Sequence, residues 1–286
     1  MTLREYTRRI TNTLQPLYDA YEAAAIVKTY LQARLSLPAH ELVLRANDTL
    51  PESLALRFER DLRQLQAGTP LQYVLGEAEF FGLTLKVTPD VLIPRPETEE
   101  LVDLILQQHG RSPALRIWDV GTGSGCIAIA LAKHLPQAEV FATDLSEPAL
   151  AVARANAEAN HATIKLARHD MLDATNLPFG DTRFDILVSN PPYIPAALRS
   201  TMHRNVVAHE PPSALFVPDD NPLLFYEALA EIGERCLTPH GEIYAETFEG
   251  YHEELRTLFL SHGYADFQSL EDINGKRRMI HAKQRL

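Results

Sequence analysis

The feature that most constrains the fold is a regular alternation of strand-like and helix-like segments after residue 97. Alternating βα units place parallel strands side by side with helices on both faces of the sheet. The sequence therefore predicts an α/β fold with a doubly wound, mostly parallel sheet. Strands are expected at residues 115–120, 139–143, 164–167, 184–189 and 242–246, helices at about 125–134, 147–159, 222–236 and 251–262, and a closing hairpin at 264–268 with 277–283.

The residues before this region have a different pattern. Over the first 68 residues, apolar positions recur at helical spacing between prolines, and no strand-like alternation begins before Tyr73. Residues 80–87 then alternate around Gly82, which is typical of a short hairpin. We therefore expect three parts, namely a small helical domain of residues 1–72, a β-hairpin linker of residues 73–96 and the α/β domain of residues 97–286.

A glycine-rich turn follows the first strand of the α/β domain, in the segment of residues 119–125, Asp-Val-Gly-Thr-Gly-Ser-Gly. Glycine allows a tight strand-to-helix turn and a close approach of the backbone to a ligand. The segment does not match the dinucleotide fingerprint, because Cys126 stands where that pattern needs glycine. It also lacks the Gly-Lys-Ser/Thr ending of a phosphate-binding loop.

An acid at the end of the next strand, Asp144, lies 21 residues after Gly123. A carboxylate there can accept both hydroxyls of a ribose, which indicates a nucleoside-containing cofactor with S-adenosylmethionine as the leading candidate. The alternative for Asp144 is a helix cap, although Ser146 is better placed for that role. The predicted cofactor residues in this part of the chain are Gly121, Thr122, Gly123, Ser124, Gly125 and Asp144.

Asp170 and Met171 follow the third strand, and both could complete that site. Asp170 could accept the amino group of an adenine while Met171 covers the ring. The alternative is that Asp170 is an ordinary loop acid, and the sequence alone leaves both interpretations open.

The segment Asn190-Pro191-Pro192-Tyr193 follows the strand of residues 184–189 directly. A planar amide or aromatic amine is a poor nucleophile, so its methylation depends on orientation and electrostatics. The Asn190 side-chain oxygen and the Pro191 carbonyl can accept the two N–H groups, and Tyr193 can pack on the flat face. We expect Asn190, Pro191 and Tyr193 to be catalytic. The alternative is a proline turn after a strand.

Composition limits the partners and the location. The net charge is -11, and residues 86–286 carry 18 Lys and Arg against 28 Asp and Glu, which disfavours a surface that tracks nucleic acid. Two cysteines without a C-x-x-C pair argue against a disulfide framework and a structural zinc site, so no metal is expected. No apolar run approaches the roughly 18 residues of a membrane span, and no signal peptide opens the chain. We expect a monomer located in the cytoplasm, with no contact to membranes.

Taken together, these motifs resemble the protein-(glutamine-N(5)) methyltransferases of peptide chain release factors, the PrmC/HemK family. The resemblance covers nearly the whole chain, and its most specific part is the linker segment of residues 91–99, Val-Leu-Ile-Pro-Arg-Pro-Glu-Thr-Glu. It implies a class I S-adenosylmethionine-dependent methyltransferase with a Rossmann-like core and a substrate-holding helical domain. It also implies methylation of the glutamine in the Gly-Gly-Gln motif of class I release factors, with an effect on translation termination.

The resemblance also concerns single residues of this chain. It places cofactor contacts at residues 121–125, Asp144, Met171 and Asn190, and the glutamine pocket at residues 190–193. It implies that Arg95 and Glu97 close over the site, for which a salt-bridged joint is the alternative. The chain departs from the family at His209, where an aromatic residue is usual before Glu-Pro, and at residues 214–221, where a glycine-rich stretch is usual.

Two other functions remain as alternatives. An adenine or cytosine amino-methyltransferase acting on nucleic acid would share the Asn-Pro-Pro-Tyr motif, but it would need a basic groove. A noncatalytic cofactor-binding protein would be expected to lose Asn190 or the glycine turn, and this chain keeps both.

Overall fold

The computed structural model describes residues 1–112 and 114–285 of the chain, which divide into two compact units. The helical unit contains residues 1–77 together with residues 203–209, and the sheet unit contains the remaining described residues. No local sequence pattern predicts that residues 203–209 associate with the first helices.

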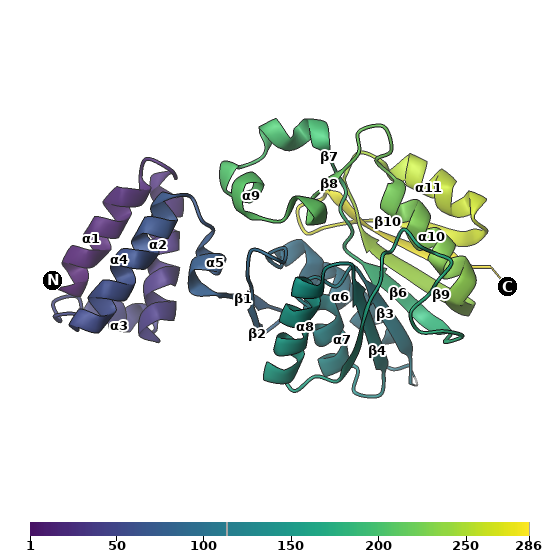
Figure 1. Cartoon of the computed structure of the whole chain (residues 1–286), viewed down its shortest axis with the longest axis horizontal. Coiled ribbons are helices and arrows are strands. Elements are labelled where there is room, and N and C mark those ends of the chain that lie inside the picture. The colour runs from purple at the N-terminus through teal and green to yellow at the C-terminus, as the bar shows by residue number, and fades with distance from the viewer. Residues whose placement is uncertain (113, 286) are drawn as a thin grey trace. The chain divides into compact units, whose positions relative to one another are not determined.

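The helical unit is built from helices (Figure 1) that share one core of buried apolar side chains. Its first helix begins in a capping box, in which Thr2 accepts from the Glu5 backbone and Glu5 accepts from the Thr2 backbone. Asp19 caps the second helix in a similar way, and the apolar faces of the helices bury Tyr6, Ile10 and Phe58. The helices of residues 1–77 are α1 (Leu3–Leu14), α2 (Ala20–Leu35), α3 (Ala39–Leu44), α4 (Glu52–Gln66) and α5 (Leu71–Leu75).

The segment of residues 203–209 contains helix α9 (Arg204–His209). Within the helical unit, the Asn205 side-chain amide donates to the Tyr18 hydroxyl, and the His203 ring stacks on the Tyr18 ring. Gly68 leaves the space for this contact, because a Cβ there would lie 2.8 Å from the Asn205 side-chain oxygen. His209, the first departure from the family pattern, is the last residue of α9.

A short hairpin follows the first five helices, as the sequence predicts. Strand β1 (Glu77–Phe80) pairs with β2 (Leu83–Lys86), and the turn at Phe81 and Gly82 has positive φ at both residues. After an extended stretch, helix α6 (Pro96–His109) begins with Pro96 at its first position, where the missing N–H costs no hydrogen bond.

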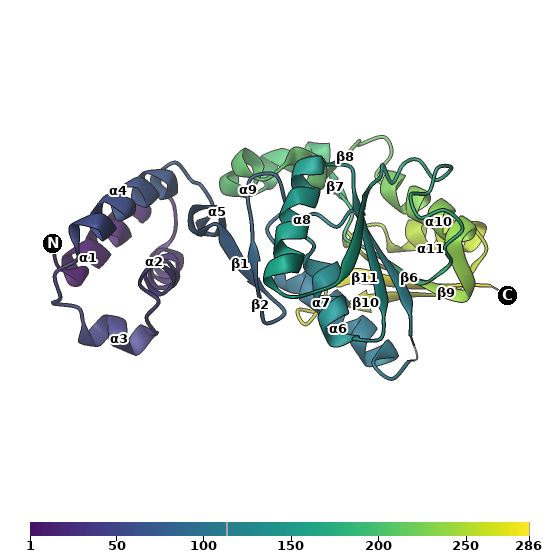
Figure 2. The same cartoon turned by 60° about the horizontal axis from the view of Figure 1, so that its bottom comes forward.

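The sheet unit contains a seven-stranded sheet in the order β10-β11-β9-β6-β3-β4-β5 (Figures 1 and 2). The pairs β9·β6, β6·β3, β3·β4 and β4·β5 are parallel, whereas β11 is antiparallel to both β9 and β10. This confirms the predicted doubly wound, mostly parallel sheet. Its strands are β3 (Arg116–Val120), β4 (Glu139–Asp144), β5 (Ile164–Arg168), β6 (Phe184–Ser189), β9 (Leu237–Glu246), β10 (Tyr264–Glu271) and β11 (Arg277–Gln284).

Helices cover both faces of the sheet, because successive side chains of a strand point to opposite faces. In β6, Ile186 and Val188 join the cluster that α6 and α7 (Cys126–His134) cover, while Leu187 joins the cluster under α10 (Leu224–Cys236) and α11 (His252–Ser261). Helix α8 (Glu147–Ala159) contributes Ala157 to the first of these clusters. Both cores consist of buried, mostly apolar side chains, and they fix the strands whose ends form the site.

The chain after β6 also forms short elements that the sequence did not predict. Strands β7 (Ile194–Pro195) and β8 (Phe216–Val217) pair in parallel, and the 3-10 turns η1 (Ala196–Thr201) and η2 (Pro212–Ala214) flank them. Within residues 1–112 and 114–285, no helix combines the length and the apolar character needed to cross a membrane.

Candidate active site

The predicted site residues gather at the carboxyl ends of the parallel strands. The glycine turn follows β3, Asp144 ends β4, Asp170 follows β5 and Asn190 follows β6. The chain runs from β3 to β4 on one side and returns to β6 on the other side of β3. Ligands of doubly wound folds bind in the crevice at such a reversal of strand order.

The backbone of the glycine turn is held against β4. The N–H groups of Gly121 and Thr122 donate to the Thr143 carbonyl at 2.9 and 2.7 Å. Gly123 has φ of 53°, and an added Cβ would meet no atom within 4 Å. The turn therefore presents open backbone, over which a bound molecule can lie closely.

The last glycine of the turn is constrained by packing instead. Gly125 has φ of 84° and stands at the N-cap of α7. A Cβ at this position would lie 3.2 Å from Cβ of Ala153 in α8 and 3.0 Å from Cδ1 of Ile129. Gly125 therefore allows α7 and α8 to approach each other.

Asp144 connects the glycine turn to the next helix. Its Oδ2 accepts from the Gly123 N–H at 2.8 Å, and its Oδ1 accepts from the Ser146 N–H at 2.9 Å. Burial raises the pKa of Asp144, and these backbone donors oppose the shift. Ser146 itself caps α8 by accepting from the Ala149 N–H, as predicted. Each Asp144 oxygen keeps a lone pair for a further donor.

A fully buried carboxyl supports the turn from below. Asp119 Oδ2 accepts from the Thr122 hydroxyl at 2.6 Å and from the Ala128 N–H at 3.2 Å, and burial raises the pKa of Asp119 to about 7. Its Oδ1 has no hydrogen-bond partner among residues 1–112 and 114–285. The Thr122 side chain thus stabilises the turn, and the Ser124 side chain is buried beside it.

Asp170 and Met171, which follow β5, differ in their exposure to solvent. Asp170 is exposed, and its Oδ1 accepts from the Leu172 N–H at 3.0 Å, which is the bond of an ordinary loop acid. Met171 is nearly buried and packs in the core with Trp118 and Phe141. Their contacts with an adenine stay predictions.

Asn190 lies directly after β6, which a hydrogen bond from Ser189 Oγ to the Val120 carbonyl fixes to the end of β3. The Asn190 side chain is partly exposed, and its Nδ2 donates to Thr98 Oγ1 at 3.0 Å. Its Oδ1 has no partner in the part of the chain that the structure describes. The amide therefore offers a free acceptor at the strand edge.

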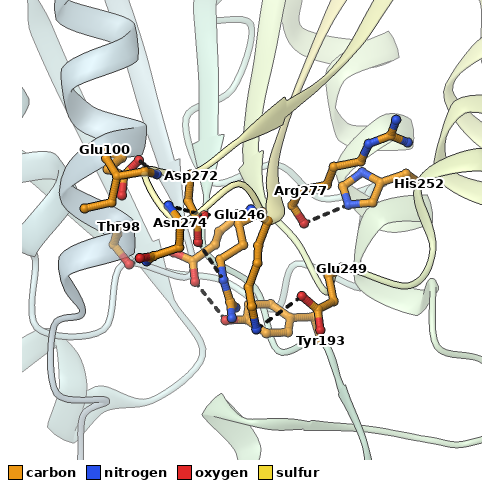
Figure 3. A network of polar contacts seen from close by, with 12 residues as sticks. Thr98, Glu100, Tyr193, Glu246, Glu249, His252, Asp272, Asn274 and Arg277 are labelled. Atoms are coloured by element: carbon orange, nitrogen blue, oxygen red, sulfur yellow. Dashed lines mark hydrogen bonds and ion pairs between the residues drawn. The ribbon is translucent and has the colours of Figure 1, made fainter.

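Thr98 continues this contact into the interior, where it meets a buried carboxylate. Thr98 Oγ1 donates to Glu246 Oε2 at 2.6 Å, and the Tyr193 hydroxyl donates to Glu246 Oε1 at 2.8 Å. Figure 3 shows the Thr98 and Tyr193 side chains converging on Glu246. Burial raises the pKa of Glu246, and both hydroxyls oppose that shift.

Sequence reasoning did not assign a role to Thr98 or Glu246. A signal existed, because Glu246 ends a predicted strand at the same sheet edge as Asn190. Thr98 lies in the segment of residues 91–99, in which the family resemblance assigned a role only to Arg95 and Glu97. No local sequence pattern predicts a hydrogen bond between these two side chains, which lie 148 positions apart in the chain.

The remaining residues of the motif are buried or partly buried. Pro191 is buried, Pro192 is partly buried, and Tyr193 is partly buried with its hydroxyl directed at Glu246. The predicted contacts of the Pro191 carbonyl and of the Tyr193 ring with a planar group stay predictions.

The Arg95 side chain forms an ion pair with buried Glu210, whose other oxygen accepts from the Ile93 N–H at 3.2 Å. Glu210 thereby ties the segment before α6 to the segment after α9. Closure of Arg95 and Glu97 over the site stays a prediction. No group of three His, Cys, Asp or Glu side chains in residues 1–112 and 114–285 is arranged to hold a metal ion.

Two family models match the chain. The Methyltransferase small domain matches residues 98–209, and the PrmC N-terminal domain matches residues 5–76. The first match contains the glycine turn, Asp144 and Asn190. Its description names a methyltransferase domain.

Solved structures show the same fold at low sequence identity. The T. thermophilus 16S rRNA N2 G1207 methyltransferase RsmC, in complex with AdoMet and guanosine, has a TM-score of 0.54 and 19% identity, over 73% of this chain and 50% of that one. A methyltransferase from Pyrococcus furiosus has a TM-score of 0.53 and 17% identity, over 82% of this chain and 100% of that one.

Curated relatives extend the similarity to the whole chain. The release factor glutamine methyltransferase of Bacteroides thetaiotaomicron is 39% identical over 282 residues, which is 99% of this chain and 100% of the relative. That of Flavobacterium psychrophilum is 39% identical over 283 residues, 98% of each chain. With this identity over full length, the chain belongs to the release factor glutamine methyltransferase family.

Proposed function

We propose that this protein transfers a methyl group from S-adenosylmethionine to the side-chain amide nitrogen of the glutamine in the Gly-Gly-Gln motif of class I peptide chain release factors, and so modulates translation termination. One observation carries the proposal: Asn190 stands at the strand edge with Nδ2 engaged by Thr98 and Oδ1 free to accept. A substrate amide needs such an acceptor. The names of the full-length relatives point to the same substrate.

The residues around the glycine turn fit S-adenosylmethionine. The open backbone at Gly121 and Gly123 leaves room for a bound molecule, and Asp144 keeps acceptors for hydroxyl groups. Below the turn, the buried Asp119 Oδ1 has no hydrogen-bond partner in the part of the chain that the structure describes. The residues proposed to hold the cofactor are Gly121, Thr122, Gly123, Ser124, Gly125, Asp144, Asp170, Met171 and Asn190. When bound, the cofactor supplies an electrophilic methyl group on a sulfonium.

The chain's own residues then orient the substrate amide. Asn190 Oδ1 accepts one N–H, and the Pro191 carbonyl accepts the other, so that the nitrogen lone pair is directed rather than averaged over rotations. Tyr193 and Pro192 complete the pocket around the planar group. Orientation of this kind lowers the entropic part of the barrier by several kcal/mol, up to about 7–11 kcal/mol in well-aligned reactions.

The helical unit is proposed to hold the release factor. We divide the chain into a substrate-binding domain of residues 1–72, a hairpin linker of residues 73–96 and a methyltransferase domain of residues 97–286. Release factors act on cytoplasmic ribosomes, so the enzyme would work there, as a monomer. The net charge of -11 supports a protein substrate over nucleic acid.

A labelling experiment tests the proposal. The protein is incubated with methyl-labelled S-adenosylmethionine and one of three acceptors, namely a purified class I release factor, the same factor with its Gly-Gly-Gln glutamine replaced by alanine, or duplex DNA. We expect label on the intact factor alone, with a mass increase of one methyl group on that glutamine. Label on DNA, or equal label on the glutamine-replaced factor, would contradict the proposal.

A further inference from the structure

A side-chain amide such as that of Asn190 has two ends of similar size and opposite hydrogen-bonding character. One end donates and the other accepts, so a rotation by half a turn would replace the acceptor facing the substrate with a donor. The two orientations are equivalent in shape, and only hydrogen-bond partners distinguish them. Something in the site must therefore select one orientation.

The hydroxyl of Thr98 makes this selection through Glu246. A carboxylate is an acceptor without a proton to give. The 2.6 Å separation of Thr98 Oγ1 from Glu246 Oε2 is that of a charge-assisted hydroxyl-to-carboxylate bond, in which Thr98 supplies its proton. A hydroxyl has one proton, so Thr98 can only accept from Asn190, and the Nδ2 end of Asn190 must face it.

Burial makes the selection strict. Thr98 and Glu246 are only 2% and 1% exposed, so water cannot replace either partner. The second oxygen of Glu246 is engaged as well, because Tyr193 donates its hydroxyl to Oε1. The same carboxylate thus contacts the motif at Tyr193 directly (Figure 3). It reaches Asn190 through the Thr98 hydroxyl.

We propose that Thr98 and Glu246 are positioning residues that hold the Asn190 amide with Oδ1 toward the reacting nitrogen. Glu246 sets the direction of the Thr98 hydroxyl, and Thr98 passes that direction to Asn190. Neither residue needs to touch the substrate. The inference concerns how the proposed glutamine methylation is achieved, and so it rests on the proposed function.

The first test replaces Thr98 by valine, which keeps the shape and removes the hydroxyl. We expect kcat for release factor methylation to fall about 10- to 100-fold, as for the loss of one buried hydrogen-bond partner. The dissociation constant of S-adenosylmethionine should change little by comparison, whereas the melting temperature should fall, because Glu246 Oε2 loses its buried donor. Thr98→Ser restores the hydroxyl and should restore most of kcat. Thr182→Val removes a threonine hydroxyl bonded to the Phe179 carbonyl before β6, and it should leave kcat at the wild-type value.

The second test reverses the direction of the hydrogen bond between Thr98 and Glu246. Glu246→Gln can donate its amide N–H to Thr98, which frees the Thr98 proton to face Asn190 and favours the wrong amide orientation. We expect kcat to fall at least as far as in Thr98→Val. In the Thr98→Val background the same change should lower kcat less, since the Thr98 hydroxyl that joins Glu246 to Asn190 is already absent. Glu249→Gln, an exposed glutamate paired with Lys276 at 3.5 Å, is the control.

A third measurement reads the orientation without catalysis. In protein with 15N-labelled asparagine, the Nδ2 proton of Asn190 that bonds Thr98 should exchange slowly with solvent in the wild type and in Thr98→Ser, and fast in Thr98→Val. Asn190→Ala assigns the signal.

The outcomes separate the two claims. Wild-type kcat in Thr98→Val and Glu246→Gln, or fast exchange of this Nδ2 proton in the wild type, would overturn the positioning role while leaving glutamine methylation in place. A wild-type protein that protects this proton but labels no release factor would instead contradict the proposed function.

Discussion

Gly123 donates its backbone N–H to Asp144 Oδ2 at 2.8 Å, which joins the turn after β3 to the end of β4. The bond fixes the carboxylate beside backbone that is open to solvent. The same carboxylate that shapes the turn is therefore the one proposed to accept the ribose hydroxyls. A substitution that keeps an acceptor for the Gly123 N–H but removes the negative charge separates the structural role of Asp144 from its proposed binding role.

Asp144→Asn keeps one carbonyl oxygen, which can still accept from Gly123, but it lacks the charge and the second acceptor. We expect the dissociation constant of S-adenosylmethionine to rise about 10- to 100-fold, because hydrogen bonds to charged groups contribute about 1.5–3 kcal/mol. Titration calorimetry measures this directly. Asp266→Asn is the control, since Asp266 is exposed and its φ of 50° suits asparagine. Unchanged cofactor affinity in Asp144→Asn would remove Asp144 from the cofactor site.

A second prediction concerns the close approach of α7 and α8. Gly125→Ala forces a residue with Cβ to adopt φ of 84° and places that Cβ 3.2 Å from Ala153. Gly180 also has positive φ, at 59°, but a Cβ there would meet nothing within 4 Å. Gly180→Ala should therefore cost only the backbone penalty, about 1–2 kcal/mol. Gly125→Ala should cost about 1–3 kcal/mol more through overpacking.

Urea unfolding of both variants checks this difference in the free energy of unfolding. Equal destabilisation would mean that the helices move apart without cost, and that Gly125 is needed for its φ alone.

The order of the elements could be predicted from the sequence because strands and helices have distinct periods. Side chains of β6 point into two apolar cores, whereas α6 carries one apolar stripe. The spacing of apolar residues in each segment therefore predicts both the type of element and the faces that it buries. The glycine turn and Asp144 could be predicted because they lie at strand ends, where a local pattern fixes the place in the sheet.

The contacts between distant segments could not be predicted in this way. Thr98 reaches Glu246 and Arg95 reaches Glu210 only after the strands are placed, and neither pair has a local signature. The extent of β9, which begins at Leu237 rather than at residue 242, was hidden by Pro239 and Gly241, which usually end strands. The association of residues 203–209 with the helical unit depends on Tyr18, far away in the sequence.

A third prediction follows from the buried carboxyl of Asp119. Burial raises the pKa of Asp119 to about 7 from an ordinary value of 3.8, and the nearby Asp144 charge adds to the rise. The folded state therefore holds this proton more tightly than the unfolded chain does. Its contribution to stability is complete below about pH 4 and is lost as the pH rises to about 7. Three pKa units correspond to about 4 kcal/mol.

Asp119→Asn removes this titration and keeps an acceptor for Ala128. We expect the free energy of unfolding of the wild type, measured relative to Asp119→Asn, to fall between about pH 4 and pH 7. Denaturant titrations at several pH values give the difference. A difference that does not change with pH would show that Asp119 is already ionised in the folded protein at acidic pH.

The last prediction addresses Asn190 itself. Asn190→Ala removes the free Oδ1 acceptor and leaves Thr98 and Glu246 in place, so kcat for release factor methylation should fall about 100- to 1000-fold, as for an oriented donor or acceptor that acts in the transition state. Cofactor binding should be at least partly retained, which titration calorimetry checks in the same samples. Asn160→Ala is the matched control, because the Asn160 side chain, at the C-cap of α8, donates to the Thr84 and Asn156 carbonyls. Wild-type turnover in Asn190→Ala would show that another group orients the amide.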